Sequence, residues 1–276
     1  LYQLSFSFHN IFFLQKMRHL VFATDSRGSK LKSYLEKEEP FDFHNDNIVI
    51  VRPGGKLSDI RELVKTKVDS IMRIDKLFTI WIFLAGGICN LTSKITHSGG
   101  TEIQYIRSDQ NVQSVILQFR DFFNYFQSIE NVFVKIACIP CACIEKYFQF
   151  NISKGKLFYS IFTPEERQMQ QKYLEEDVKE INTSLFQFTF PVRWDRDILF
   201  CKRKKSGRNK NMSKKIVKLS FKHLYDGVHP DSELSDKWFH FMCLSLSSSV
   251  NSNANVLIED NDSDQESGSW DFKRSK

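Results

Sequence analysis

Short apolar runs alternate along the chain with stretches whose apolar residues recur every three or four positions. An uninterrupted apolar run predicts a buried strand, and the longer spacing predicts a helix with one buried face. Strands are predicted in "HLVFATD", "NIVIV", "KLFTIWIFLAG", "NVFVKIACIP" and "KKIVKLS" (19–25, 47–51, 76–86, 131–140 and 214–220). Helices are predicted over 28–39, 57–72, 112–129, 163–188 and 230–246.

Strands that are apolar on both faces and separated by helices are typical of a parallel sheet covered on both sides. We therefore predict a three-layer α/β/α sandwich with a five-stranded, mainly parallel sheet of the flavodoxin-like, doubly wound type. This domain should cover about residues 17–248. The 276 residues, 41% of them hydrophobic, are enough for one such core.

The sequences at the two ends of the chain differ in character from that of the predicted domain. Residues 1–16 are apolar but lack a basic start and a small-residue cleavage site, so they are predicted to be an extension that is not native, with Met17 as the true start. The acidic stretch 249–276 is predicted to be disordered. The longest apolar run, 78–89, is too short to span a bilayer, which favours a cytoplasmic or nuclear protein.

Six cysteines raise the alternatives of a metal site or a redox pair, because "CIPCAC" (138–143) contains a C-x-x-C spacing. A zinc site needs a second ligand pair at similar spacing, and none follows. The motif comes after an apolar run rather than at the start of a helix early in the chain. Buried or surface thiols are the favoured reading, in a reducing compartment and without a metal.

The net charge of +6 is unevenly distributed, with a basic stretch at 202–215 and an acidic one at 259–271. The basic stretch, which includes Lys202, Arg203, Lys204 and Lys205, has two readings. It is a nucleic-acid patch or nuclear signal, or it is an exposed loop between the last long helix and the fifth strand. Few aromatic residues accompany it, so base stacking is not indicated, and the loop is favoured.

Polar and Gly-rich segments follow four of the predicted strands: "TDSRG", "RPGGKL", "AGGICNLT" and "YDGVHPD". Ligands of open α/β sheets bind at the carboxyl ends of the strands, so these segments should meet at one edge. Ser26 is placed to act as a nucleophile, His229 as its base, and Asp226 as the group that orients the base. The backbone N–H groups of Ser26 and of Gly55 or Gly54 are candidates for an oxyanion hole.

Each of these segments also has an ordinary structural reading. Ser26 or Asp25 could be a helix N-cap, Gly54 and Gly55 could be turn residues after Pro53, and Asp226-Gly227 is a common turn. Their joint occurrence in this order favours catalysis.

The four segments together resemble the motif blocks of the SGNH (GDSL-type) hydrolases. That family has Gly-Asp-Ser after the first strand, Gly after the second, Gly-x-Asn-Asp after the third, and Asp-x-x-His near the C-terminus. Here the matches are Asp25-Ser26, Gly55, the Gly87–Asn90 segment, and Asp226 with His229. The variant blocks are also similar to SGNH-like domains in open reading frames of invertebrate mobile elements.

The chain departs from the family pattern at two blocks. Thr24 stands where the family has Gly. Cys89 stands where the family has its oxyanion-hole Asn, and a thiol is a poor hydrogen-bond donor. Asn90, one position later, is the candidate replacement.

The resemblance implies a monomeric serine esterase that acts on a small acyl-ester substrate without metal or cofactor. The alternative is a weakened SGNH-like binding module that contacts nucleic acid through the basic stretch. A flavodoxin-like nucleotide binder is disfavoured, since no strand end carries a phosphate-binding Gly-rich pattern.

Overall fold

The computed structural model describes residues 18–32, 48–74, 78–195, 199–204 and 214–255. The proposed extension 1–16, and with it the choice of Met17 as the start, lies outside these residues, as does residue 256 onward of the predicted acidic tail.

A four-stranded parallel sheet in the order β2-β1-β3-β6 forms the centre of the fold. Its strands are β1 (Arg18–Asp25), β2 (Ile48–Arg52), β3 (Thr79–Ala85) and β6 (Val132–Ile136). All three pairings are parallel, so the four carboxyl ends lie along one edge. Residues 20–25 of β1 and 80–85 of β3 are buried throughout, because both faces of the sheet are covered.

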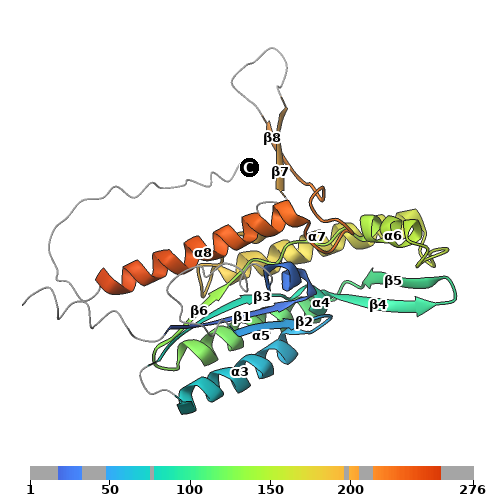
Figure 1. Ribbon diagram of the computed structural model, residues 1–276. Coiled ribbons are helices and arrows are strands. Elements are labelled where there is room, and N and C mark those ends of the chain that lie inside the picture. The colour runs from blue at the N-terminus through green and yellow to red at the C-terminus, as the bar shows by residue number, and fades with distance from the viewer. Residues whose placement is uncertain (1–17, 33–47, 75–77, 196–198, 205–213, 256–276) are drawn as a thin grey trace, which may run out of the picture.

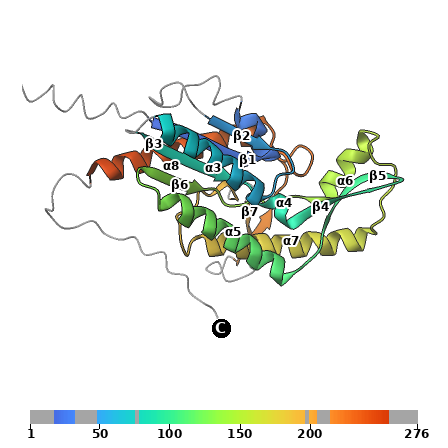
Figure 2. The same cartoon turned by 90° about the horizontal axis from the view of Figure 1, so that it is seen from below.

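Helices cover both faces of the sheet (Figures 1 and 2). α3 (Leu57–Ile74) and α5 (Asp109–Gln127) lie on one face, and α8 (Ser232–Asn255) lies on the other. α7 (Pro164–Leu185) packs beside α5 and begins at a capping box, in which Thr163 and Glu166 each accept a hydrogen bond from the other's backbone N–H. The predicted three-layer α/β/α class is confirmed.

The predicted number of strands and the place of the fifth are wrong. The segment "KKIVKLS" forms β8 (Lys214–Leu219), which pairs antiparallel with β7 (Leu199–Lys204) in a separate hairpin that projects from the body in Figure 1. Lysines at 214, 215 and 218 explain this, because a central strand would have to bury them. Beside β6 stands instead a single parallel bridge between Ala137 and Val192.

Several other elements differ from the sequence prediction. The predicted basic loop 202–215 contributes to both strands of the β7–β8 hairpin, and residues 205–213 lie outside the described part. Helix α8 continues to Asn255, past the predicted domain boundary at 248. Besides η1 (Ser26–Gly28) and β7, the sequence analysis missed α4 (Ile88–Leu91), the hairpin strands β4 (Thr92–His97) and β5 (Gly100–Tyr105), and α6 (Ile144–Ser153). The mostly polar sequence of the β4–β5 hairpin hides it from a search for apolar runs.

A pair of tryptophans attaches α8 to the sheet. The rings of Trp194 and Trp238 stack with centroids 4.8 Å apart, and each indole N–H donates to the backbone carbonyl of the other residue, at 3.2 and 3.1 Å. Trp194 also packs on Phe83 of β3, at 5.4 Å between centroids. Both indoles are buried and hydrogen-bonded, which suits aromatic residues with a polar atom.

No helix in the described residues is long and apolar enough to cross a membrane.

Replacing Trp238 by Ala should lower the free energy of unfolding by about 3–5 kcal/mol, because it leaves a cavity and an unpaired carbonyl at Trp194. Urea unfolding followed by circular dichroism measures the loss. Leu244→Ala on the same helix, where the side chain is 52% exposed, should change it by no more than about 0.5 kcal/mol. Equal losses in the two variants would contradict an anchoring role for the tryptophan pair.

Candidate functional site

Ser26 lies at the carboxyl end of the central strand. It follows Asp25, the last residue of β1, and opens the short 3-10 helix η1 (Ser26–Gly28). The Asp25 carboxylate caps this helix by accepting a hydrogen bond from the backbone N–H of Arg27 at 3.0 Å. The helix-cap reading therefore applies to Asp25, while Ser26 is half-buried with its hydroxyl turned to another partner.

That partner is His229, which a tight loop carries from far along the chain. Asp226 shapes the loop: its Oδ1 accepts from the backbone N–H groups of Val228 at 2.9 Å and of His229 at 2.7 Å. Its other oxygen, Oδ2, lies 2.6 Å from Nδ1 of His229. The bridge between Leu224 and Pro230 closes the loop at its base.

Ser26 and His229, 203 residues apart in sequence, are in hydrogen-bond contact, with 3.0 Å between Oγ and Nε2. Ser26, His229 and Asp226 thus form one continuous chain of hydrogen bonds. An ionised carboxylate only accepts, so Nδ1 carries the imidazole proton and Nε2 is left to accept from the Ser26 hydroxyl. Such a chain of hydrogen bonds can activate a serine hydroxyl for acyl transfer, with the imidazole taking the proton and the carboxylate orienting the imidazole.

The electrostatics of Asp226 agree with this assignment. Burial raises the pKa of the Asp226 carboxyl, but the hydrogen bonds from the side chain and backbone of His229 and from Val228 outweigh it, and the net pKa is lowered. Asp226 therefore stays ionised at neutral pH, as the orientation of the imidazole requires.

Gly227 allows the loop to approach the neighbouring helix. It has a φ of +87°, and a Cβ at this position would lie 2.5 Å from the carbonyl oxygen of Cys143 and 2.6 Å from the backbone nitrogen of Tyr147. The Gly227 carbonyl also accepts from the Cys143 N–H at 2.7 Å. Only glycine fits both the backbone conformation and the contact with the start of α6.

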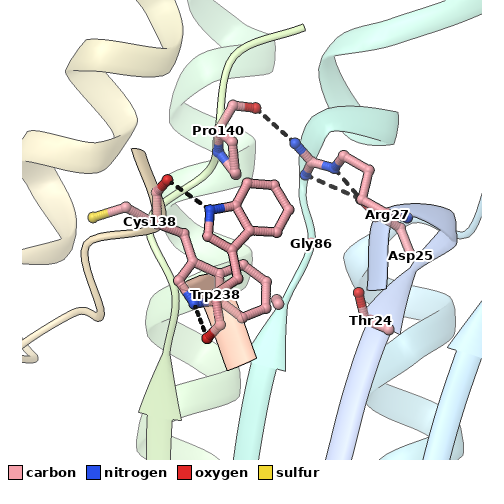
Figure 3. Close-up of a pocket in the computed structure, with 9 residues that line it drawn as sticks. Thr24, Asp25, Arg27, Gly86, Cys138, Pro140 and Trp238 are labelled. Atoms are coloured by element: carbon pink, nitrogen blue, oxygen red, sulfur yellow. Dashed lines mark hydrogen bonds and ion pairs between the residues drawn. The ribbon is translucent and has the colours of Figure 1, made fainter. Parts of the chain in front are cut away.

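Arg27 is a buried residue of the site that the sequence analysis missed. Its guanidinium donates to both oxygens of Asp25, at 3.2 Å each, and to the carbonyl of Pro140 at 2.6 Å. Figure 3 shows it reaching from the end of β1 to the segment after β6. A lone Arg after a Ser gives no pattern signal, because its buried partner is 113 residues away.

The substitution of Thr24 for the expected Gly is accommodated by Gly28. A Cβ on Gly28 would lie 2.3 Å from the Thr24 side chain, so the missing side chain at Gly28 leaves the room that Thr24 fills. The Thr24 hydroxyl is buried with no hydrogen-bond partner in the described residues. It borders a small cavity, also lined by Arg27, Gly86 and Trp238, with room for about one water molecule (Figure 3).

Two of the predicted oxyanion donors are engaged elsewhere. The Gly55 N–H donates to the carbonyl of Arg52 at 2.9 Å, closing a turn centred on Pro53 and Gly54. The Asn90 side chain accepts from the Leu57 N–H at 3.0 Å and donates to Gln118 at 3.2 Å, so it caps the start of α3. The hydrogen bond between Gly55 and Arg52 agrees with the interpretation of Gly54 and Gly55 as turn residues.

Cys89, at the family Asn position, is half-buried in α4. Burial, followed by the charge of Asp25, raises the pKa of its thiol to about 11, so it is neutral at pH 7. Among the residues predicted for the oxyanion hole, Ser26 carries its N–H at the first position of the short helix η1, where no intrahelical partner exists.

Tyr225 is a second neighbour of the triad that the sequence analysis missed. Its ring stacks on the His229 imidazole at 5.9 Å, and Phe150 of α6 meets it edge-on at 5.8 Å. Lys30 lies over the same ring at 5.2 Å. This places an aromatic surface, 46% exposed at Tyr225, directly beside the His229 imidazole.

The "CIPCAC" cysteines behave as thiols held in the protein interior. Cys138 and Cys141 are buried and Cys143 is half-buried, with none of the three in a disulfide. Burial is the main cause of the raised pKa of all three thiols. In the described part of the chain, no three His, Cys, Asp or Glu side chains cluster closely enough to hold a metal ion.

Contact between nucleic acid and Lys202–Lys205 stays a prediction, since the structure does not describe these side chains.

Comparisons with known proteins give few matches. Neither a comparison with protein-family models nor one with curated proteins finds a match. Among solved structures, one from Streptococcus pneumonia, described as "a putative platelet activating factor", is 13% identical, covers 89% of this chain and 90% of its own, and has a TM-score of 0.40. A TM-score of this size does not establish a shared fold, so the fold class rests on the sheet topology.

Replacing Gly227 by Ala should lower the free energy of unfolding by about 2 kcal/mol or more, since it combines backbone strain with a backbone clash. Gly54→Ala is the matched control. Its φ is +69°, but nothing lies within 4 Å of the added Cβ, so backbone strain alone should lower the free energy of unfolding, by about 1 kcal/mol. Chemical denaturation compares the two. A loss at Gly54 equal to that at Gly227 would contradict the close packing of the loop on α6.

Proposed function

We propose that this chain is a serine ester hydrolase of the SGNH type. The observation that carries the proposal is the 3.0 Å contact between Ser26 Oγ and His229 Nε2, with Asp226 on the far side of the imidazole. The location at the carboxyl edge of a parallel sheet supports it, because ligands of such sheets bind there. The order of the motif blocks along the chain supports the family.

In the proposed reaction, Ser26 Oγ attacks the acyl carbonyl of an ester while Nε2 of His229 takes its proton. Asp226 accepts from Nδ1 and stabilises the imidazolium. His229 then returns the proton to the departing alcohol oxygen, leaving an acyl group on Ser26. A water molecule, deprotonated by His229, attacks this acyl group, and the carboxylic acid leaves as Ser26 is regenerated.

The weak part of the proposed enzyme is stabilisation of the oxyanion. The Gly55 N–H donates within its own turn, the Asn90 amide donates to Gln118 while its oxygen caps α3, and Cys89 offers only a thiol. Loss of one oxyanion donor typically costs about 10²–10³ in kcat. We therefore expect slow turnover that is easiest to detect with activated aryl esters, whose leaving groups depart readily.

The triad is tested with p-nitrophenyl acetate and butyrate. Ser26→Ala and Asp226→Asn should each lower kcat by at least about 10³-fold. The control is Asp231→Asn in the same segment. It removes a carboxylate that pairs with His223 at 3.0 Å instead of with His229, and should leave kcat within about threefold. No turnover by the parent protein, or turnover that survives Ser26→Ala, would sink the proposal.

The oxyanion assignment has its own pair of variants. Asn90→Ala should lower the free energy of unfolding by about 1 kcal/mol, as loss of a helix cap does, and lower kcat by less than about tenfold. Cys89→Asn restores the amide of the family pattern and should raise kcat, by up to about 10²–10³-fold. A large fall in kcat for Asn90→Ala with no gain for Cys89→Asn would assign the donor to Asn90 instead.

A further inference from the structure

A groove of about 520 Å³ lies at the β6 edge of the sheet and contains none of the triad residues. Its walls come from β3, β6, α5 and the segment that follows α7. Six aromatic side chains line it: Trp81, Phe123, Phe133, Phe186, Phe188 and Phe190. Ligand sites of proteins are typically of this size and lined mainly by apolar and aromatic side chains with few polar groups.

The aromatic walls are ordered by contacts with one another. Trp81 and Phe133, neighbours across the β3–β6 pairing, stack at 4.6 Å between centroids. On the opposite wall Phe123 meets Phe188 at 5.9 Å. Phe190, 87% exposed, and Phe186, 49% exposed, lie on the outer part of the lining. Exposing a contiguous apolar surface of this kind to water is unfavourable. Such surfaces in folded proteins commonly mark binding sites.

The charge in the groove is one-sided. Lys135 lies two residues after Phe133 on β6, on the same face of the strand, and is half-buried. None of the described acidic side chains pairs with it, and no Asp or Glu lines the groove. Burial without a counter-charge lowers the pKa of the Lys135 ammonium. An anion placed beside it would offset this unfavourable desolvation by charge pairing.

Trp81, one of the residues that line the groove, carries a second donor that has no acceptor. The indole N–H of Trp81 is buried, and no described residue accepts a hydrogen bond from it. Buried polar groups are nearly always paired, so an orphaned N–H on the lining of a groove is a reason to look for a ligand. The charged and orphaned groups of the groove, Lys135 and the Trp81 indole, both donate.

We propose that this groove binds an amphipathic carboxylate, with its alkyl or aryl body between the Phe133 and Phe188 walls and its carboxylate at Lys135. A neutral alcohol would fill the same walls but leave the ammonium uncompensated, and an ammonium ligand would oppose it. The inference does not depend on the proposed hydrolase, because no residue of the triad takes part.

The test is isothermal titration calorimetry of the full chain carrying Ser26→Ala, with decanoate as the ligand, below its micellar concentration. Decanol supplies the chain without the charge, decylammonium reverses the charge, and acetate supplies the charge without the chain. Decanoate should bind at least about tenfold more tightly than each of the others, as expected for a charge-assisted hydrogen bond together with apolar burial. Equal affinities for decanoate and decylammonium would overturn the proposal.

Two variants locate the bound ligand. Lys135→Met keeps the apolar stem and should weaken decanoate about tenfold or more while leaving decanol unchanged; Trp81→Phe should weaken decanoate by a smaller factor. Lys172→Met, at an exposed lysine of α7 outside the groove, is the matched control and should change nothing. Unchanged decanoate binding in Lys135→Met would place the carboxylate elsewhere, including at the triad, and reject the site.

Sedimentation without ligand separates this site from a protein interface. A monomer is expected at all concentrations used. A dimer that dissociates on Phe190→Ser would make the groove a contact between copies of the chain and overturn the proposal.

Discussion

The position of the candidate site depends on one constraint: strand β1 is paired on both sides. Its register against β2 and β3 is set by continuous parallel pairing, and its side chains are buried on both faces. A slip by one residue would turn every side chain of the strand to the opposite face. The strand therefore ends at Asp25, and Ser26 emerges at the carboxyl edge within hydrogen-bond reach of His229.

The segments at this edge differ in how well they fit the proposed hydrolase. The positions of Ser26 and His229 are supported by several independent contacts: Asp25 caps η1, Asp226 holds the loop of His229, and Gly227 brings that loop against α6. The replacement of Gly by Thr24 is balanced by the space left at Gly28. The donors for an oxyanion have no such compensation, because the candidates other than Ser26 serve the turn and the cap of α3.

The sequence predicted the parts of this protein that follow from local periodicity. Uninterrupted apolar runs identified β1, β2, β3 and β6, and the 3.6-residue spacing identified α3, α5, α7 and α8. It failed for "KKIVKLS", whose apolar residues suggest a strand without showing which sheet it joins. Pairing is a long-range choice, and the lysines of this segment favour an exposed hairpin over a fifth central position. The β4–β5 hairpin escaped notice because polar strands at a surface lack the apolar signal.

The chain alone determined that a Ser follows an inner strand of the sheet, since the residue types and their order can be read directly. The Asp and the His follow the segment predicted as a fifth strand, which forms β8 of the separate hairpin instead. Only the tertiary structure decided which atoms meet: it put Nε2 of His229 beside Ser26, turned Asn90 toward α3, and brought Arg27 to the Pro140 carbonyl. The physical reason is that side-chain direction depends on contacts between segments many residues apart. Hydrogen bonds, which require alignment within a fraction of an ångström, cannot be read from spacing in sequence.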